Sequence, residues 1–242
     1  MPPLVAATLV VLFEALAFGA VFPVIAYYCD DLGGGPLAVG VMFALTSAPR
    51  VFTNPVFGRV ADRIGRRPSL IISTIGTFSG SILWAISPNL LWLGISRTVT
   101  GVFGAQAPLA QAIAADVSSP EKRAASVGLL GAAFGIALTL GPALGGFVAH
   151  HYSPAAVGWL CAAMQFTSMC VIIFALKETK PASDGSADAP ERHWIHIPGV
   201  ERPHVVRMLV VTLLTMLAIS HFNSGFPLAV EELYGFSVDQ AG

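Results

Sequence analysis

Long apolar runs separated by short polar loops dominate the chain. A helix needs about 20 apolar residues to cross the hydrocarbon core of a bilayer, and about seven runs approach that length. Lipid cannot satisfy an exposed strand edge, and the strands of a barrel are shorter and alternate, so the runs predict helices. We expect an all-α integral membrane protein. The runs cover residues 4–28, 37–57, 68–87, 90–114, 124–149, 154–176 and 205–230.

The positive charges lie on one side of this pattern. Of the 13 Lys and Arg residues, all but Arg50 and Arg97 follow the second, fourth and sixth runs, and the loops after the first, third and fifth runs contain none. The positive-inside rule therefore predicts that the N-terminus and the even-numbered loops are cytoplasmic. A multi-pass protein of the plasma membrane, or of the inner membrane of a bacterial cell, is expected.

The chain divides into three predicted parts. Residues 1–176 are expected to form a six-helix transmembrane bundle. Residues 177–204 are rich in Pro, Ser and Asp, a composition typical of a linker, here on the cytoplasmic side. Residues 205–242 are expected to begin a second bundle.

A short repeat supports that division. Phe226 and Pro227 near the end of the seventh run repeat Phe22 and Pro23 near the end of the first, and each pair precedes two acidic residues. We interpret the seventh run as the restart of a parallel repeat, as in transporters built from two such units. The chain then stops where an eighth helix would begin, so we expect a fragment that lacks its C-terminal half. A natural half-size protein is the alternative.

Glu14 is an acid within the first run. It lies roughly ten residues, or about 15 Å, into the run and hence near the bilayer midplane. A charge there costs at least about 2.5 kcal/mol on insertion scales, which makes an ionisable residue a functional candidate. Burial penalises the ionised carboxylate, so Glu14 is a candidate proton carrier. A permanent pair with Arg97, or hydrogen bonds to water, is the alternative.

The fourth run carries a second candidate. An ideal helix puts Arg97 on one face with Gln111 and small residues, and turns Gln106 away. This face suits a substrate cavity, whereas a tight helix contact with a snorkelling Arg97 is the alternative. Arg50 lies nearer the inner third of its run and is expected to snorkel. Further cavity candidates are Asn54, Gln165, His221 and Asn223.

The fifth run is rich in glycine. Small residues at four-residue spacing permit close contact between helix backbones, and a proline in a helix favours a kink. Such a helix could seal a cavity or act as a hinge. The small residues and the proline are Gly128, Gly131, Gly135, Ala137, Gly141, Pro142, Gly145 and Gly146.

A hydrophilic island at residues 58–70 is interpreted as a cytoplasmic latch. Asp62 is expected to accept hydrogen bonds from a helix N-terminus, and the arginines to pair with Asp116 and Glu121 below the fourth and fifth runs. A latch that breaks and reforms would shift the equilibrium between an inward-closed and an inward-open conformation. A loop that only orients the protein in the membrane is the alternative. The predicted latch residues within the island are Gly58, Asp62, Arg63, Gly65, Arg66 and Arg67.

Several classes of chemistry lack support in the sequence. The three cysteines and the histidines show no metal-ligand spacing, and the phosphate-binding pattern GxxxxGK[ST] does not occur. We expect no metal, no cofactor, no enzymatic activity and no nucleic-acid partner. The expected partners are the lipid bilayer, protons and a small-molecule substrate.

These motifs together resemble the major facilitator superfamily, and within it the twelve-helix drug:proton antiporters that include the tetracycline efflux proteins. The island matches the motif between helices two and three, with Val60 where Leu is usual. Arg97 and Gly101 match the helix-four motif. The fifth run matches the helix-five antiporter motif, with Ala137 in place of one Gly.

The resemblance implies proton-coupled efflux of an amphipathic drug, with Arg97 in proton coupling. Glu14 falls where tetracycline exporters carry a helix-one acid, and residues 177–180 look like those of the efflux proteins. Gly80 stands where these exporters have an acid in helix three, which puts tetracycline itself in doubt. A metabolite facilitator or symporter of the same fold, or a truncated fragment that transports nothing, remains an alternative.

Overall fold

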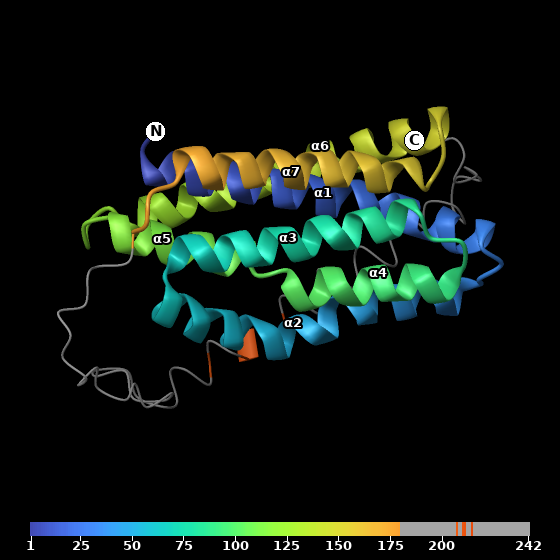
Figure 1. Cartoon of the computed structure of the whole chain (residues 1–242), viewed down its shortest axis with the longest axis horizontal. Coiled ribbons are helices and arrows are strands. Elements are labelled where there is room, and N and C mark those ends of the chain that lie inside the picture. Colours follow the sequence, from blue (N-terminus) through green and yellow to red (C-terminus); the bar gives the residue numbers. More distant parts are fainter. Residues whose placement is uncertain (180–206, 208–209, 212–213, 215–242) are drawn as a thin grey trace. The chain divides into compact units, whose positions relative to one another are not determined.

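The computed structural model describes residues 1–179, 207, 210–211 and 214. Its described residues contain helices and no strands, which confirms the all-α prediction (Figure 1). Residues Met1–Pro181 form one compact unit. The seventh predicted span, with His221 and Asn223, lies almost entirely outside the described residues. The helices are α1 (Pro3–Asp31), α2 (Pro36–Ile64), α3 (Arg66–Ala85), α4 (Leu90–Phe103), α5 (Gln106–Val117), α6 (Arg123–His151) and α7 (Ala156–Ala175).

The helix ends follow local sequence signals. Pro3 and Pro36 open α1 and α2, where the missing N–H of proline costs no hydrogen bond. Asn89 caps α4 by accepting a hydrogen bond from the backbone N–H of Trp92 at 3.1 Å. Gly65 separates α2 from α3 at φ 109°, a conformation that favours glycine. Helices α1, α2, α3, α6 and α7 are long and apolar enough to cross a membrane.

The fourth predicted span is not one helix. It consists of α4 and α5, which are interrupted at Gly104 and Ala105. Pro108 has no N–H to donate to the carbonyl of Gly104, and its ring crowds that carbonyl, so the helix cannot continue through this point. The expectation of a continuous helix over residues 90–114 was therefore wrong.

Helix α1 lies at the centre of the unit and packs against α5, α6 and α7. Its closest approach is to α6, where a Cβ on Gly145 would collide with the backbone oxygen of Ala20. Gly141 similarly faces Gly19, so the predicted close backbone contact is confirmed for Gly141 and Gly145. Gly131 and Gly135 are exposed, and a Cβ added at either position would meet no atom within 4 Å.

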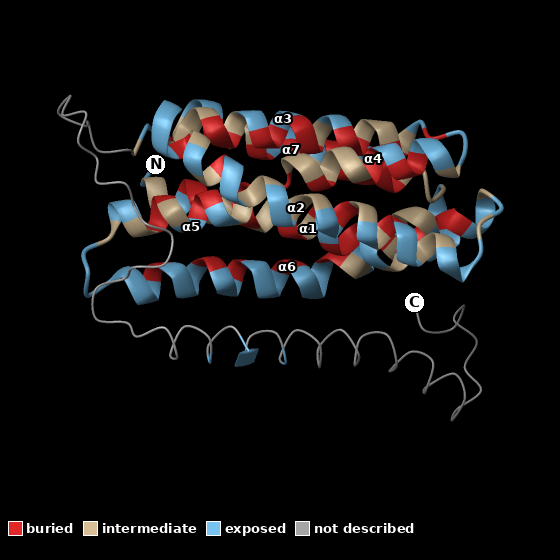
Figure 2. Ribbon diagram, turned by 90° about the horizontal axis from the view of Figure 1, so that it is seen from below, coloured by how far each residue is buried: buried red, intermediate tan, exposed pale blue. Residues whose placement is uncertain are grey.

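Two of the apolar helices are little buried within the unit. In the most apolar window, 11% of the α2 residues and 22% of the α6 residues are buried, against 56% for α1. Figure 2 shows the exposed face of α6 along one side of the bundle. These faces of α2 and α6 are thus apolar surfaces that the described residues do not cover.

Candidate functional site

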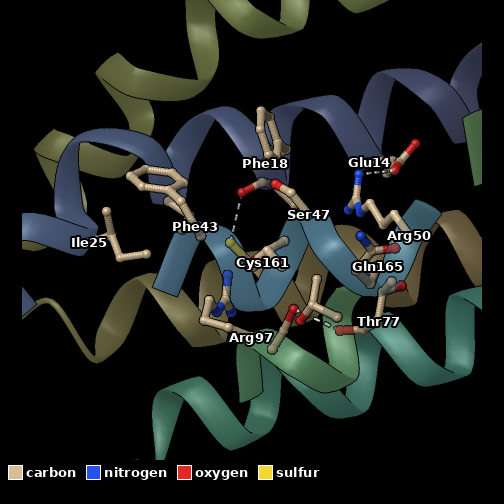
Figure 3. Close-up of a pocket in the computed structure, with 15 residues that line it drawn as sticks. Glu14, Phe18, Ile25, Phe43, Ser47, Arg50, Thr77, Arg97, Cys161 and Gln165 are labelled. Carbon is tan, nitrogen blue, oxygen red and sulfur yellow. Dashed lines mark hydrogen bonds and ion pairs between the residues drawn. The ribbon is translucent and has the colours of Figure 1, made fainter. Parts of the chain in front are cut away.

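A small cavity opens between the helices near the middle of α1 (Figure 3). Its volume is about 70 Å³, which holds a few water molecules rather than a whole drug-sized ligand. Four ionisable side chains line it together with apolar and amide groups. The lining residues used below are Glu14, Phe18, Phe43, Arg50, Thr77, Arg97, Cys161 and Gln165.

Glu14 faces the cavity from α1 and is 7% exposed. Its Oε1 atom lies 4.0 Å from Nη1 of Arg50 on α2, and its Oε2 atom has no hydrogen-bond partner among the described residues. Arg50 was expected to snorkel toward the cytoplasm, and this expectation was wrong because its guanidinium turns inward to the acid. The charged partner of Glu14 is thus Arg50 rather than Arg97.

Arg97 is the second buried cation of the cavity. It is 5% exposed, and its guanidinium lies 4.3 Å from the ring centroid of Trp84, a cation–π contact. Its Nε donates to the hydroxyl of Ser96 at 3.3 Å. No carboxylate of the described residues lies within ion-pair distance of Arg97. With Glu14 ionised, the lining carries one more positive than negative charge.

Two amide side chains of the fourth predicted span lie differently from the sequence expectation. Gln106, expected to face away, is fully buried and donates to Oγ1 of Thr77 at 2.7 Å and toward Oε1 of Gln165 at 3.5 Å. Gln111, expected in the cavity, is exposed and does not line it. The interruption of the fourth span resets the helical phase, which explains why Gln106 turns into the protein interior and Gln111 turns outward.

Two predicted cavity residues on α2 and α7 have separate outcomes. Gln165 lines the cavity and is 4% exposed. Asn54 does not line it, although its Oδ1 atom is buried without a hydrogen-bond partner among the described residues. Sequence reasoning missed Thr77 and Cys161, because hydroxyl and thiol groups on apolar helices carry no distinct signal.

The hydrophilic island, which was predicted to form a cytoplasmic latch, contains a cluster of charged side chains. Nε of Arg66 lies 3.0 Å from Oδ2 of Asp116, and Nη1 of Arg66 lies 2.9 Å from Oδ1 of Asp62. The Arg66–Asp116 contact is the one expected from the sequence. Asp62 pairs with Arg66, and the helix N-terminus beside it is capped by another carboxylate.

That carboxylate belongs to Glu178, just beyond α7. Glu178 accepts hydrogen bonds from the backbone N–H groups of Arg66 at 2.9 Å and of Arg67 at 3.2 Å, which cap the N-terminus of α3. Arg67 in turn donates from Nη2 to the carbonyl of Ile173 at 2.6 Å, near the C-terminus of α7. The two helix ends therefore cap each other.

The remaining members of the predicted latch lie around this cluster. Arg63 is exposed, and Gly58 is half-buried with nothing within 4 Å of a built Cβ. Glu121 is exposed, and a hydrogen bond from the hydroxyl of Ser119 lowers the pKa of its carboxyl group. Glu121 was expected to pair with an arginine of the island, and its resolved contact is with Ser119.

Long apolar helices around a cavity that contains a buried carboxyl group and two guanidinium groups define a helical membrane protein with ionisable groups in its interior. The family model of the Major Facilitator Superfamily matches residues 7–242. The chain belongs to this superfamily and is a multi-pass membrane protein.

Curated relatives and solved structures agree with this assignment. The chain is 33% identical over 183 residues to the tetracycline resistance protein, class B, of Escherichia coli, covering 74% of this chain and 45% of that protein. It is 32% identical over 154 residues to major facilitator superfamily domain-containing protein 10 of Mus musculus, covering 64% of this chain and 32% of that protein.

Two structural matches show the same fold. The human organic anion transporter MFSD10 (TETRAN) matches with a TM-score of 0.62 and 22% identity, over 73% of this chain and 47% of that one. The peptide transporter POT in complex with sulfate matches with a TM-score of 0.64 and 17% identity, over 98% of this chain and 48% of that one. The chain thus spans about half the length of the tetracycline resistance proteins that it matches.

Proposed function

We propose that this chain forms part of a proton-coupled antiporter that exports an amphipathic small molecule. Glu14 would bind a proton when the cavity faces outward and release it when the cavity faces inward. Substrate and proton would then occupy the cavity in alternation. No enzymatic step is part of this proposal.

The observation that carries the proposal is the position of Glu14. A buried carboxyl group near the middle of a spanning helix, open to a cavity and close to a guanidinium group, can exist in both protonation states. A purely structural acid would have its hydrogen-bonding capacity filled, yet Oε2 of Glu14 has no partner among the described residues. This free capacity supports a role in binding a proton, water or substrate.

Arg97 is proposed to stabilise the ionised state of the cavity. Its burial without a carboxylate partner leaves a positive charge that favours a negative group nearby. The glycine-rich face of α6 against α1 is proposed to allow the small movements that alternate access requires.

Substrate class is proposed from the relatives. Tetracyclines and organic anions, the compounds in the names of the tetracycline resistance proteins and of MFSD10, are the first classes to test. The aromatic rings of Phe18 and Phe43 line the cavity and suit the apolar part of such a molecule. The cavity volume of about 70 Å³ requires that further surfaces complete the site.

The charged cluster around Arg66 is proposed to act as the cytoplasmic latch. Its contacts join α2, α3, α5 and the segment after α7, so its rupture would free several helix ends together. We further propose that the N-terminus is cytoplasmic and that residues 177–204 link this bundle to a second one.

The test is efflux from everted membrane vesicles that contain the full product of the gene. With an imposed proton gradient, we expect accumulation of tetracycline or of an organic anion in the vesicles, and Glu14→Gln should abolish it. Asp30→Asn is the matched control, because Asp30 is an exposed acid on the same helix. Equal accumulation by the parent protein and Glu14→Gln would remove Glu14 from the mechanism.

A further inference from the structure

The interruption of the fourth span lies beside Glu14. Gly104 and Ala105, which separate α4 from α5, are buried. Non-helical backbone at the depth of the bilayer is tolerated only where protein surrounds it or where it lines a cavity. The position of this interruption next to the cavity therefore calls for a physical explanation.

Helix α3 stabilises the interruption. The hydroxyl of Ser73 donates a hydrogen bond to the carbonyl of Phe103 and accepts one from the backbone N–H of Ala105 at 3.2 Å. One side chain thus satisfies a backbone group on each side of the break. The break is a formed feature of the fold with its own supporting contact.

Gly104 provides the space for Arg50. A Cβ at Gly104 would lie 2.6 Å from both Nε and Nη2 of Arg50, so the guanidinium lies against bare backbone. The same guanidinium reaches Glu14 at 4.0 Å through Nη1 (Figure 3). Any side chain at position 104 would have to displace the guanidinium that faces the acid.

The break also creates a helix N-terminus next to the acid. Ala107, in the first turn of α5, contributes its backbone to the electrostatic surroundings of the Glu14 carboxyl group. The first N–H groups of a helix have no partner within the helix and carry partial positive charge. Helices interrupted at mid-membrane place such ends at ion sites in other transporters.

The charged and titratable groups around Glu14 are few. Arg50 faces it from α2, Arg97 lines the cavity from α4, and Cys161 lines it from α7. Helix α3 contributes the hydroxyl of Thr77, and no residue of α5 or α6 lines the cavity. Arg50 is the cation that approaches the carboxylate of Glu14 within ion-pair distance.

We propose that Arg50 and the interruption at Gly104 are positioning elements for Glu14, which together hold its carboxylate in the ionised state until a proton replaces the ion pair. This inference rests on the proposed role of Glu14 as a proton carrier. It assigns a function to Arg50 and explains why glycine stands at position 104.

Carbodiimide labelling tests the proposal on the purified chain in lipid nanodiscs. Dicyclohexylcarbodiimide modifies protonated carboxyl groups in apolar surroundings, and mass spectrometry locates the product, with Glu14→Gln as the blank. The readout is the ratio of the labelling rate at about pH 6 to that at about pH 8. A change of access alone multiplies both rates equally, whereas a change of charge state alters the ratio.

The parent protein should show a high ratio. Arg50→Gln and Gly104→Ala should each lower this ratio roughly tenfold. An opposite charge as close as Arg50 is to Glu14 changes the pKa of a carboxyl group by about one unit or more. Arg50→Lys should restore part of it. Gly40→Ala on α2 is the matched control, because a Cβ there meets nothing within 4 Å. In the Arg50→Gln background, Gly104→Ala should have little further effect.

Parent-like ratios in both Arg50→Gln and Gly104→Ala would overturn the inference, as would a parent that labels equally at both pH values. If Gly104→Ala fails to fold, Arg50→Gln and Arg50→Lys decide the question. Failure of the proposed function has a different signature, because the labelling ratios would change as expected while Glu14→Gln still transported its substrate.

Discussion

At the scale of single residues, Glu178 accepts hydrogen bonds from two backbone amides at the start of α3. A carboxylate that caps a helix N-terminus stabilises it by about 0.5–2 kcal/mol through hydrogen bonds and the helix dipole. Gly65 makes this position of Glu178 possible, since a Cβ at residue 65 would collide with Oε2 of Glu178. The glycine of the island therefore provides both a turn and a place for the capping carboxylate.

Replacing Glu178 by alanine should loosen the first turn of α3. We expect hydrogen exchange at the amides of Arg66 and Arg67 to accelerate about five- to tenfold, equivalent to about 1 kcal/mol of local stability. Hydrogen exchange with mass spectrometry measures it. Glu121→Ala is the control, because Glu121 is an exposed acid between α5 and α6 whose carboxyl group bonds to Ser119. An unchanged rate in Glu178→Ala, or an equal rise in Glu121→Ala, would contradict the capping role.

Sequence reasoning found charged partners more readily than backbone partners. The contact between Arg66 and Asp116 was predictable, because opposite charges at the same end of neighbouring spans attract. The cap by Glu178 was missed, because its partners are backbone amides that every residue carries. Arg50 was misplaced, since the sequence does not show that Gly104 leaves room for its guanidinium.

At the scale of elements, the contact between α1 and α6 determines how the bundle closes. Gly141 and Gly145 lie against the backbone of α1, whereas Gly146 has nothing within 4 Å of a built Cβ. Two adjacent glycines on one helix therefore have different packing. This difference makes them a natural test of the contact.

Gly145→Ala should destabilise the protein by about 1–3 kcal/mol, because the added methyl group meets the backbone oxygen of Ala20 and forces the helices apart. Gly146→Ala should change stability by no more than about 0.5 kcal/mol. Thermal unfolding in detergent micelles, followed by the helical circular dichroism signal, compares the two variants. Equal stabilities would show that α1 and α6 are not in close contact.

Periodicity and length predicted most of the helices. The apolar runs located α1, α2, α3, α6 and α7, because a bilayer-spanning helix needs a length and composition that the sequence shows directly. The fourth span was the exception. Pro108, four residues after Gly104, was a visible signal for the break, and the assumption of an ideal helix concealed it. The wrong orientations expected for Gln106 and Gln111 followed from that assumption.

At the scale of the whole molecule, the chain spans about half the length of the tetracycline resistance proteins that it matches. The apolar faces of α2 and α6 stay uncovered by the described residues, and the cavity beside Glu14 is small. The central claim concerns the part that is described: Glu14 exchanges a proton for substrate.

Proton release on substrate binding tests that claim most directly. The full gene product in weakly buffered detergent solution is mixed with a transported compound, and a pH indicator dye records the protons set free. The account predicts release that approaches one proton per bound substrate, in the pH range where Glu14 is protonated before binding, and none in Glu14→Gln. Undiminished proton release by Glu14→Gln would contradict the account.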